Sequence, residues 1–499
     1  MSSRGLIKSM LVIGSAQSVN ILLSILRIKV LAILLGPAGV GLLGIFNSLQ
    51  QTASMLAGLG LGTSGVRQIA FAKGDEKELS RIRTVLVGAN FVQGCMAMAA
   101  VWFMRERLAL WLLGDVIRAE QIGLIGVGVL LSLLTSSQIA LLQGMRLIGD
   151  LARVTVFGGI GGTIAGLLVV WLQGLEGLIW FVLVQPLAAV LVALYFTQKL
   201  PKLTVANLTP KEMWAVWQPM AALGGVFMLG GLATTATLLL VRGIITQELG
   251  LAGAGLFAAS WGVTMTYVGF LLGAMAADYY PRLTEVIDDH PSATRLMNDQ
   301  TQLGLAIGGP VLLLLIGLAP WVITLLYSSE FTPAAEMVQW QTVGNVFKLA
   351  SWPLGFAFVA AARSRVFLFT ELLWNLLFFI MIWVGLPLVG LEIAGTAFLI
   401  AYVIYFIVLN ALVRQLQGFR WEPLSLWLIG THAGLAFAVL ALAKAAPVSG
   451  AMMSVLLALV TGIVGLRIIL IKVGTKGRLA NRLTRIYALI RWPLEKNGD

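Results

Sequence analysis

The sequence has few charged residues and almost no cysteine or histidine. Only 11% of its 499 residues are charged, against about 25% in an ordinary soluble domain. The single cysteine, Cys95, excludes an intrachain disulfide, and two distant histidines, His290 and His432, provide no metal-ligand spacing. The chain also lacks the GxxxxGK[ST] motif that binds nucleotide phosphates. We therefore expect no cofactor, no metal and no hydrolysis of ATP through a P-loop.

Apolar residues dominate what remains. They make up 59% of the chain, against roughly 45–50% in soluble domains, and they form runs of about 20 residues, the length that crosses a bilayer core of ~30 Å. The sequence predicts an all-α polytopic membrane protein with about 14 transmembrane helices. The expected spans are 9–35, 40–64, 84–104, 121–144, 154–173, 177–198, 219–241, 253–280, 300–326, 341–362, 367–386, 393–413, 424–443 and 451–471.

The net charge of +12 could suggest a nucleic-acid partner, but the positions of the cations explain it differently. Most of the 34 Lys and Arg residues lie in the termini and the even-numbered connections between spans. Cytoplasmic loops of membrane proteins carry such an excess. We therefore expect both termini in the cytoplasm and no nucleic acid as partner. The odd-numbered, outer connections hold five cations: Arg105, Arg107, Arg118, Arg242 and Lys444.

An internal repeat is the next signal. The segment LGPAGVGLLG at 35–44 recurs as LGLAGAGLFA at 249–258, and GLEG at 174–177 recurs within GLEIAG at 390–395. Both pairs are separated by about the same number of residues, which corresponds to six spans. An even number of spans keeps both copies in one orientation and predicts two six-helix lobes related by a pseudo-twofold axis. The alternative is chance similarity between glycine-rich loops.

Four domains follow from the repeat and the spans. We predict an N-terminal lobe at 1–205, a C-terminal lobe at 206–420, two appended transmembrane helices at 421–473, and a cytoplasmic tail at 474–499. The tail places apolar residues such as Leu479 at helical spacing among arginines, which is typical of a helix lying on an anionic membrane surface. Docking of a partner protein is the alternative for this tail.

Four cations fall within or at the ends of predicted spans, where a charge costs at least ~2.5 kcal/mol. Arg27 and Lys29 lie in the first span and Lys348 in the tenth, each about 10 Å from the outer end. Arg242 directly follows the seventh span, eight residues before Gly250, at a depth that matches Arg27 and Lys29 in the repeat. Cations at one depth from both lobes would form a chamber suited to a pyrophosphate. Alternatively, Arg27 and Lys29 extend to the membrane surface and Arg242 caps its helix.

Two acids lie near the cytoplasmic ends of spans. Asp278 can pair with Arg282 at i+4, and Glu371 is one or two turns from Arg365. Boundary ion pairs are therefore one interpretation of both residues. The other interpretation makes Asp278 or Glu371 a coupling site for protons or cations, because an acid that faces a cavity within the membrane can titrate.

Five segments resemble the Wzx-type polysaccharide flippases, most closely the O-antigen translocase and lipid III flippase group, over roughly residues 5–415. They are LLGPAGVGLLGIFNSL, GVRQIAFAKGDEKELSRIR, LLQGMRLIGDLARV, ADYYPRLTEV and VQWQTVGNVFKLAS. The resemblance implies the two-lobe fold of the multidrug/oligosaccharidyl-lipid/polysaccharide exporter superfamily. It also implies a flippase that moves undecaprenyl-pyrophosphate-linked oligosaccharide units to the periplasmic leaflet of the bacterial inner membrane by alternating access.

The resemblance also assigns residues and partners. Lys29, Arg242 and Lys348 match cations of the family, and Arg67 lies where relatives carry a basic residue, whereas Asp278 replaces an uncharged residue. The implied partners are the lipid-linked oligosaccharide, membrane lipids, and polysaccharide polymerase and chain-length proteins.

Two other functions stay open. A cation-coupled multidrug exporter of the same superfamily would be expected to carry acids in its cavity. A membrane enzyme such as an O-antigen polymerase or ligase would be expected to carry a large outer loop, and the longest outer connections, near 105–120 and 327–340, have only about fifteen residues. Transport without catalysis is therefore the favoured prediction.

Overall fold

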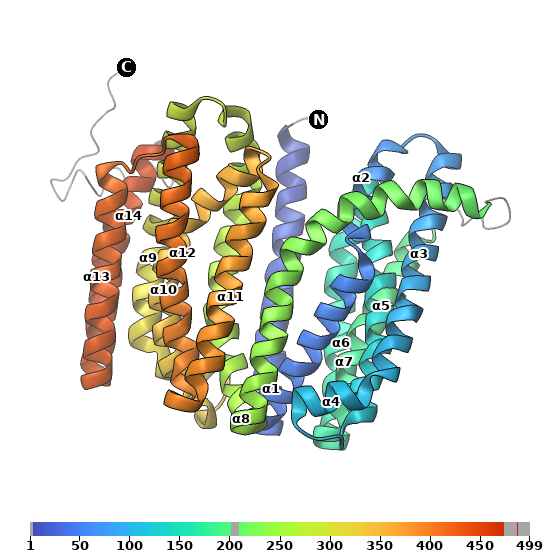
Figure 1. Cartoon of the computed structure of the whole chain (residues 1–499), viewed down its shortest axis with the longest axis horizontal. Helices are drawn as coiled ribbons and strands as arrows, with labels where there is room; N and C mark the ends of the chain where they lie inside the picture. Colours follow the sequence, from blue (N-terminus) through green and yellow to red (C-terminus); the bar gives the residue numbers. More distant parts are fainter. Residues whose placement is uncertain (1–2, 201–208, 474–486, 488–499) are drawn as a thin grey trace. The chain divides into compact units, whose positions relative to one another are not determined.

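Residues 3–200, 209–473 and 487 are described by the structure, a computed structural model, and every regular element among them is a helix (Figure 1). The prediction of an all-α protein is thus confirmed. In chain order the elements are α1 (Ser3–Gly58), α2 (Leu61–Phe71), α3 (Glu76–Phe103), α4 (Arg105–Leu113), α5 (Ala119–Gly144), α6 (Ile148–Gln173), η1 (Gly174–Gly177), α7 (Leu178–Thr197), α8 (Pro210–Val286), α9 (His290–Leu326), η3 (Ser329–Phe331), α10 (Ala334–Ala360), α11 (Ser364–Val389), η4 (Gly390–Glu392), α12 (Ile393–Gln417), α13 (Pro423–Ala445) and α14 (Pro447–Val473).

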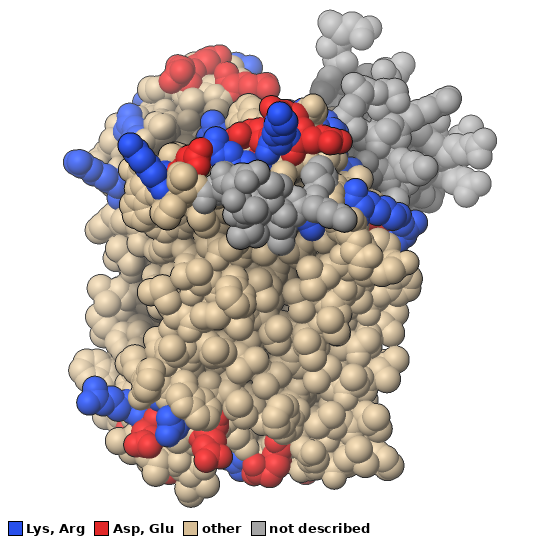
Figure 2. Space-filling model, turned by 90° about the vertical axis from the view of Figure 1, so that its right-hand side faces the viewer, with Lys and Arg blue, Asp and Glu red and all other residues tan. Residues whose placement is uncertain are grey.

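Ten helical segments of the described chain are long and apolar enough to cross a membrane. Four of them, Gly14–Gly58, Ile148–Thr197, Met228–Ala276 and Ser364–Gln417, contain 45 to 54 residues. A single crossing takes about 20 residues, so each of these four can cross twice. The ten segments therefore account for the fourteen predicted crossings. Figure 2 shows one face of the corresponding surface, on which charged residues gather at two ends and leave a band without charges between them.

Glycines make the turns inside these long segments. Gly36 interrupts α1 with φ 62°, and Gly250 interrupts α8 with φ 72°. Gly174 and Gly390 adopt φ 60° and 69° at the ends of α6 and α11. Residues with a side chain rarely adopt such angles, which explains why glycine stands there. Because the two members of each pair occupy matching places in the repeat, the two copies share their turn geometry as well as their sequence.

The two copies of the first repeated segment also contact each other directly. A Cβ added to Gly41 would lie 2.0 Å from the carbonyl oxygen of Leu251, and one added to Gly255 would lie 1.8 Å from that of Pro37. Residues 41 and 255 are equivalent in the repeat, as are 37 and 251, so the contact is reciprocal. We call this contact between α1 and α8 the glycine joint. Only glycine fits there, because the neighbouring atoms belong to the backbone.

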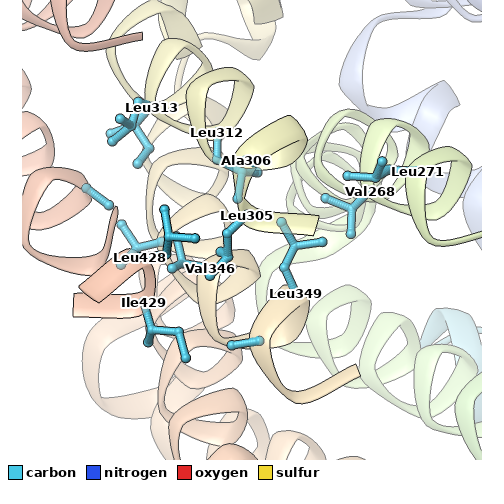
Figure 3. Packing of buried hydrophobic residues seen from close by; sticks show 14 of the residues in the cluster. Val268, Leu271, Leu305, Ala306, Leu312, Leu313, Val346, Leu349, Leu428 and Ile429 are labelled. Carbon is cyan, nitrogen blue, oxygen red and sulfur yellow. The ribbon is translucent and has the colours of Figure 1, made fainter. Parts of the chain in front are cut away.

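The chain divides into two compact units. Unit 1 comprises Met1–Ala258 and Leu326–Glu330, and unit 2 comprises Ala259–Leu325 and Phe331–Asp499. Each has its own apolar core, and Figure 3 shows that of unit 2, where α8, α9, α10 and α13 contribute buried side chains such as Leu305 and Leu349. The first unit ends at residue 258 because the first half of α8 packs with the helices of unit 1. The predicted lobes at 1–205 and 206–420 follow the repeat instead, and they stay a prediction.

Polar side chains attach α13 to α9 inside unit 2. The fully buried Asn298 accepts hydrogen bonds from the Glu422 N–H (2.9 Å) and the Ser425 hydroxyl (2.7 Å), and it donates to the Arg420 carbonyl (3.0 Å). Gln302 donates to Glu422 and Ser425, both at 2.9 Å. Hydrogen bonds of this kind are expensive to remove in an apolar interior. The first appended helix is therefore attached to unit 2 by a specific network.

The connection near 105–120, which we predict to be an outer one, contains the short helix α4. The amphipathic tail predicted at 474–499 lies outside the described residues except for Tyr487, whose hydroxyl donates to the Ile463 carbonyl.

Candidate functional site

Arg242 connects α8 to α1 within unit 1. Its Nη1 donates to the Gly44 carbonyl at 2.9 Å and to the Ser48 hydroxyl, both on α1. Its Nε is buried and makes no hydrogen bond within the described chain. Tyr327, in the segment Leu326–Glu330 that belongs to unit 1, interacts with the guanidinium electrostatically. Arg242 is thus a half-buried cation that retains an unused donor, as expected of an anion-binding residue.

Arg27 lies on α1 and is directed toward α7. Its Nη1 donates to Gln185 Oε1 at 2.9 Å, its Nη2 donates to the Ser24 hydroxyl at 3.4 Å, and its Cζ lies 5.9 Å from the centre of the Phe181 ring. The guanidinium is therefore held inside unit 1. Lys29 is half-buried two residues further along, about 200° around the helix. These two cations consequently do not face the same side of α1.

Lys348 belongs to unit 2 and lies among side chains of three helices. Its Nζ is 3.3 Å from the sulfur of Met265 and 5.4 Å from the centre of the Tyr402 ring, and it interacts electrostatically with Glu371. A cation over an aromatic face is stabilised by the ring quadrupole. Of the predicted cations, the structure thus places Arg27, Lys29 and Arg242 in unit 1 and Lys348 in unit 2.

Glu371 is placed differently from the boundary interpretation. Within the described chain it forms no ion pair with Arg365, and it interacts instead with Lys348 and with the hydroxyl-bearing Tyr402 and Tyr405. The interpretation that pairs Glu371 with Arg365 is therefore wrong. The carboxylate belongs to the interior of unit 2, where it interacts electrostatically with a cation of α10 and phenols of α12.

Asp278 lies in a different environment. Its side chain is 77% exposed and accepts a hydrogen bond from Arg282 at 3.1 Å. This is the boundary ion pair that the i,i+4 spacing indicates, and such exposed pairs contribute little energy.

Several polar groups near Lys348 and Glu371 were not singled out from the sequence. The side chain of Asn345 is fully buried and neither its Nδ2 nor its Oδ1 has a hydrogen-bond partner, and Trp374 Nε1 and Asn375 Oδ1 are also buried without one in the described chain. Buried polar groups are usually hydrogen-bonded, so an unmatched cluster needs an explanation such as water or an ion. The sequence signal was the stripe of Gln341, Asn345 and Lys348 at helical spacing in an apolar span.

The described residues contain no group of three or more His, Cys, Asp or Glu side chains that could hold a metal ion. His432 is buried in α13, with Nδ1 2.8 Å from the carbonyl oxygen of Leu428.

Comparisons with known proteins give the family and the fold. The sequence profile of the family described as "Polysaccharide biosynthesis protein" matches residues 30–336. The chain is 23% identical over 386 residues to the lipid III flippases of Escherichia coli (strain K12) and Shigella flexneri, with 76% of this chain and 91% of each relative covered.

Solved structures share the fold. The lipid II flippase MurJ, in an inward closed conformation, matches with a TM-score of 0.68 at 11% identity, covering 91% of this chain and 98% of that chain. An inward-facing multidrug resistance MATE family transporter of the MOP superfamily matches with a TM-score of 0.65 at 14% identity, covering 80% and 96%. The chain is therefore a multi-pass membrane protein with the fold of these transporters.

Proposed function

Because the chain belongs to the polysaccharide biosynthesis protein family, we propose that it is a flippase for undecaprenyl-pyrophosphate-linked oligosaccharide units of O-antigen or exopolysaccharide. It would move them from the cytoplasmic to the periplasmic leaflet of the bacterial inner membrane, with both of its own termini in the cytoplasm. The lipid III flippases that it resembles support the substrate class. The observation that carries the proposal is Arg242, a cation within a membrane-spanning helix that keeps a buried donor unused.

The pyrophosphate is the part of this lipid that a cation recognises. In the low dielectric of the membrane, a guanidinium binds a phosphate more strongly than in water, and its fork of donors fits two oxygens at once. We assign this role first to Arg242 and then to Arg27, Lys29 and Lys348. Within the described chain neither Arg27 nor Lys348 forms an ion pair at 4 Å or less. Arg27 donates to the neutral Gln185, and Glu371 interacts with Lys348 electrostatically from a greater distance.

The sugar chain sets the transport mechanism. Its hydroxyl groups lose hydrogen bonds in hydrocarbon, which costs several kcal/mol for each group transferred without a partner. A passage through the protein is therefore needed for the sugar, while the polyprenyl tail remains in lipid. Rocking between inward- and outward-open states, as repeated transporter folds allow, would expose this passage to each side in turn. The repeated segments of α1 and α8 support this mechanism.

Glu371 is the residue that we assign to ion coupling. It lies in the interior of unit 2 beside Lys348 and near the unmatched polar atoms of Asn345 and Asn375. A carboxyl group in such a place is a typical proton or cation site of a membrane transporter. Asp278 was the other predicted coupling residue, and its exposed pair with Arg282 favours a structural role. Transport that is unchanged by Glu371→Gln and by collapse of the membrane gradient would refute coupling.

The proposed function is tested by deleting the gene and following the lipid-linked oligosaccharide. We expect build-up in the cytoplasmic leaflet and loss of surface polysaccharide, both reversed by the intact gene. Lys29→Ala, Arg242→Gln and Lys348→Ala should restore less transport at normal protein level, whereas the exposed Lys73→Ala serves as the matched control. Normal surface polysaccharide with altered drug susceptibility would favour a multidrug exporter, and single unpolymerised units at the surface would favour a polymerase or ligase.

A further inference from the structure

Arg242 and the glycine joint occupy the same part of unit 1. A Cβ added to Gly44 would lie 3.3 Å from the Cβ of Ala258 and 3.6 Å from Nε of Arg242. Gly44 and Ala258 are the last residues of the two repeated segments that form the joint. The guanidinium therefore lies next to the glycine joint, and its bonds to Gly44 and Ser48 cross from α8 to α1.

These bonds are important because the residues that form the glycine joint, Pro37, Gly41, Leu251 and Gly255, are apolar. Two glycines bring backbones together but contribute only van der Waals contact, which is weak for each pair of atoms. A hydrogen bond from a charged group is stronger than one between neutral groups, particularly away from water. The hydrogen bonds of Arg242 to Gly44 and Ser48 therefore hold α1 and α8 together beside the glycine joint, and we call them the polar tie.

The same bonds prevent Arg242 from binding a pyrophosphate with two parallel hydrogen bonds. A guanidinium offers two such edges, one formed by Nη1 and Nη2 and one formed by Nε and Nη2. Nη1 is occupied by Gly44 and Ser48, and Nε is covered where α1 passes it. Neither edge can receive a phosphate until the side chain leaves α1.

We propose that Arg242 exchanges between two partners, the Gly44 carbonyl and Ser48 hydroxyl of α1 in the structure, and the pyrophosphate of the transported lipid. Binding of the lipid then removes the polar tie of the glycine joint and allows α1 and α8 to separate. Ser48 is accordingly a positioning residue, which acts on the lipid through Arg242. The proposal rests on the proposed function. In the predicted orientation the glycine joint lies on the periplasmic side. Lipid that arrives from the cytoplasm would therefore open the side of the protein through which it leaves.

The exchange predicts that substitutions at Ser48 and Arg242, two side chains in contact, change the affinity for the lipid in opposite directions. Ser48→Ala removes a competing acceptor and should tighten binding, because apparent affinity rises with the fraction of the protein that is ready to bind. Arg242→Gln removes the binding group and should weaken it. The matched control is Ser54→Ala, the same change on the same helix at a hydroxyl without a hydrogen-bond partner in the described chain, and Ser48→Thr keeps the hydroxyl.

The test is the dissociation constant of undecaprenyl pyrophosphate for the full-length protein in lipid nanodiscs. We expect binding about threefold to tenfold tighter for Ser48→Ala, unchanged for Ser48→Thr and Ser54→Ala, and at least about tenfold weaker for Arg242→Gln. If Arg242→Gln leaves binding unchanged, Arg242 does not bind the pyrophosphate, and the proposed exchange is refuted as well. Weaker binding by Arg242→Gln together with unchanged or weaker binding by Ser48→Ala would refute the exchange alone.

A second measurement reports on the joint itself. With Cys95 replaced by serine, cysteines introduced at Gly44 and Ala258 would have Cβ atoms about 3.3 Å apart, close to the usual disulfide spacing of ~3.5–4.5 Å. Disulfide formation is started with an added oxidant such as copper phenanthroline, which takes up the two electrons of the thiol pair. Once this pair is shown to bind undecaprenyl pyrophosphate, the lipid should slow disulfide formation at least about threefold, because separated helices hold the thiols apart. An unchanged rate at saturating lipid would overturn the proposal that binding opens the joint.

Discussion

Replacement of Gly255 by alanine is the sharpest test of the glycine joint. The new methyl group would start 1.8 Å from the carbonyl oxygen of Pro37, a backbone atom that no side-chain rotation can move away. The whole of α1 must therefore shift relative to α8 for the methyl group to fit. Gly225→Ala is the matched control, because a Cβ at Gly225, on the same helix, meets no atom within 4 Å.

The size of the shift follows from the distances. Ordinary contact begins near 3.4 Å, so the helices must separate by about 1.6 Å, and overpacking of this kind costs typically ~1–3 kcal/mol. Such a cost lowers the population of the closed joint by roughly 5- to 150-fold. A shift of that size would also move the Cβ atoms at positions 44 and 258 to about 4.9 Å, beyond the usual spacing of a disulfide.

The assay is the rate of disulfide formation between cysteines at positions 44 and 258, with Gly255→Ala added. We expect the rate to fall at least about fivefold relative to the parent pair, whereas Gly225→Ala should leave it unchanged. Measurement in detergent without lipid substrate separates this steric effect from binding. A parent-like rate with Gly255→Ala would show that the joint accommodates a methyl group, and the steric argument would then be refuted.

Three further results are expected. Asn298→Leu should lower the free energy of unfolding by about 2–4 kcal/mol, since it leaves the Glu422 N–H and the Ser425 hydroxyl without the acceptor that they share, and a thermal melt in detergent measures this. Arg83 is buried and donates to the carbonyls of Leu200 and Thr197 at the end of α7, so Arg83→Met should speed hydrogen exchange there. The N–H and hydroxyl of Thr209 donate to Glu212 and hold the pKa of that carboxyl below its usual value. The resulting stabilisation of the first turn of α8 is present above the ordinary pKa and is lost as pH falls through the lowered one. The protection of amides in that turn, measured as the exchange rate relative to the intrinsic rate at each pH, should therefore fall on acidification, and Glu212→Gln should flatten the profile.

The sequence was sufficient to predict the membrane fold, because each crossing appears in the sequence as a local run of apolar residues. A run of about 20 apolar residues is needed for every crossing, and an interruption of the run marks each end. The repeated segment was also visible, and its glycines at 36 and 250 proved to be matched turns. The short helix α4 was missed because nine residues with charges at one end give no span signal.

The partners of the ionisable residues were not determined in the same way. Spacing along one helix placed Arg365 near Glu371, but the carboxylate lies beside Lys348, a residue of another helix. The depth of Arg242 in the membrane predicted that it binds a pyrophosphate. Its bonds to Gly44 and Ser48, in contrast, depend on how α8 packs against α1.

The sequence by itself thus determined the number of crossings, the repeat and the family resemblance, since hydrophobic length and glycine position are properties of short segments. The tertiary structure alone decided which side chains face each other. Residues about 200 positions apart in the chain, such as Ser48 and Arg242, meet through the packing of two helices, and no local pattern encodes the rotation of one helix against another.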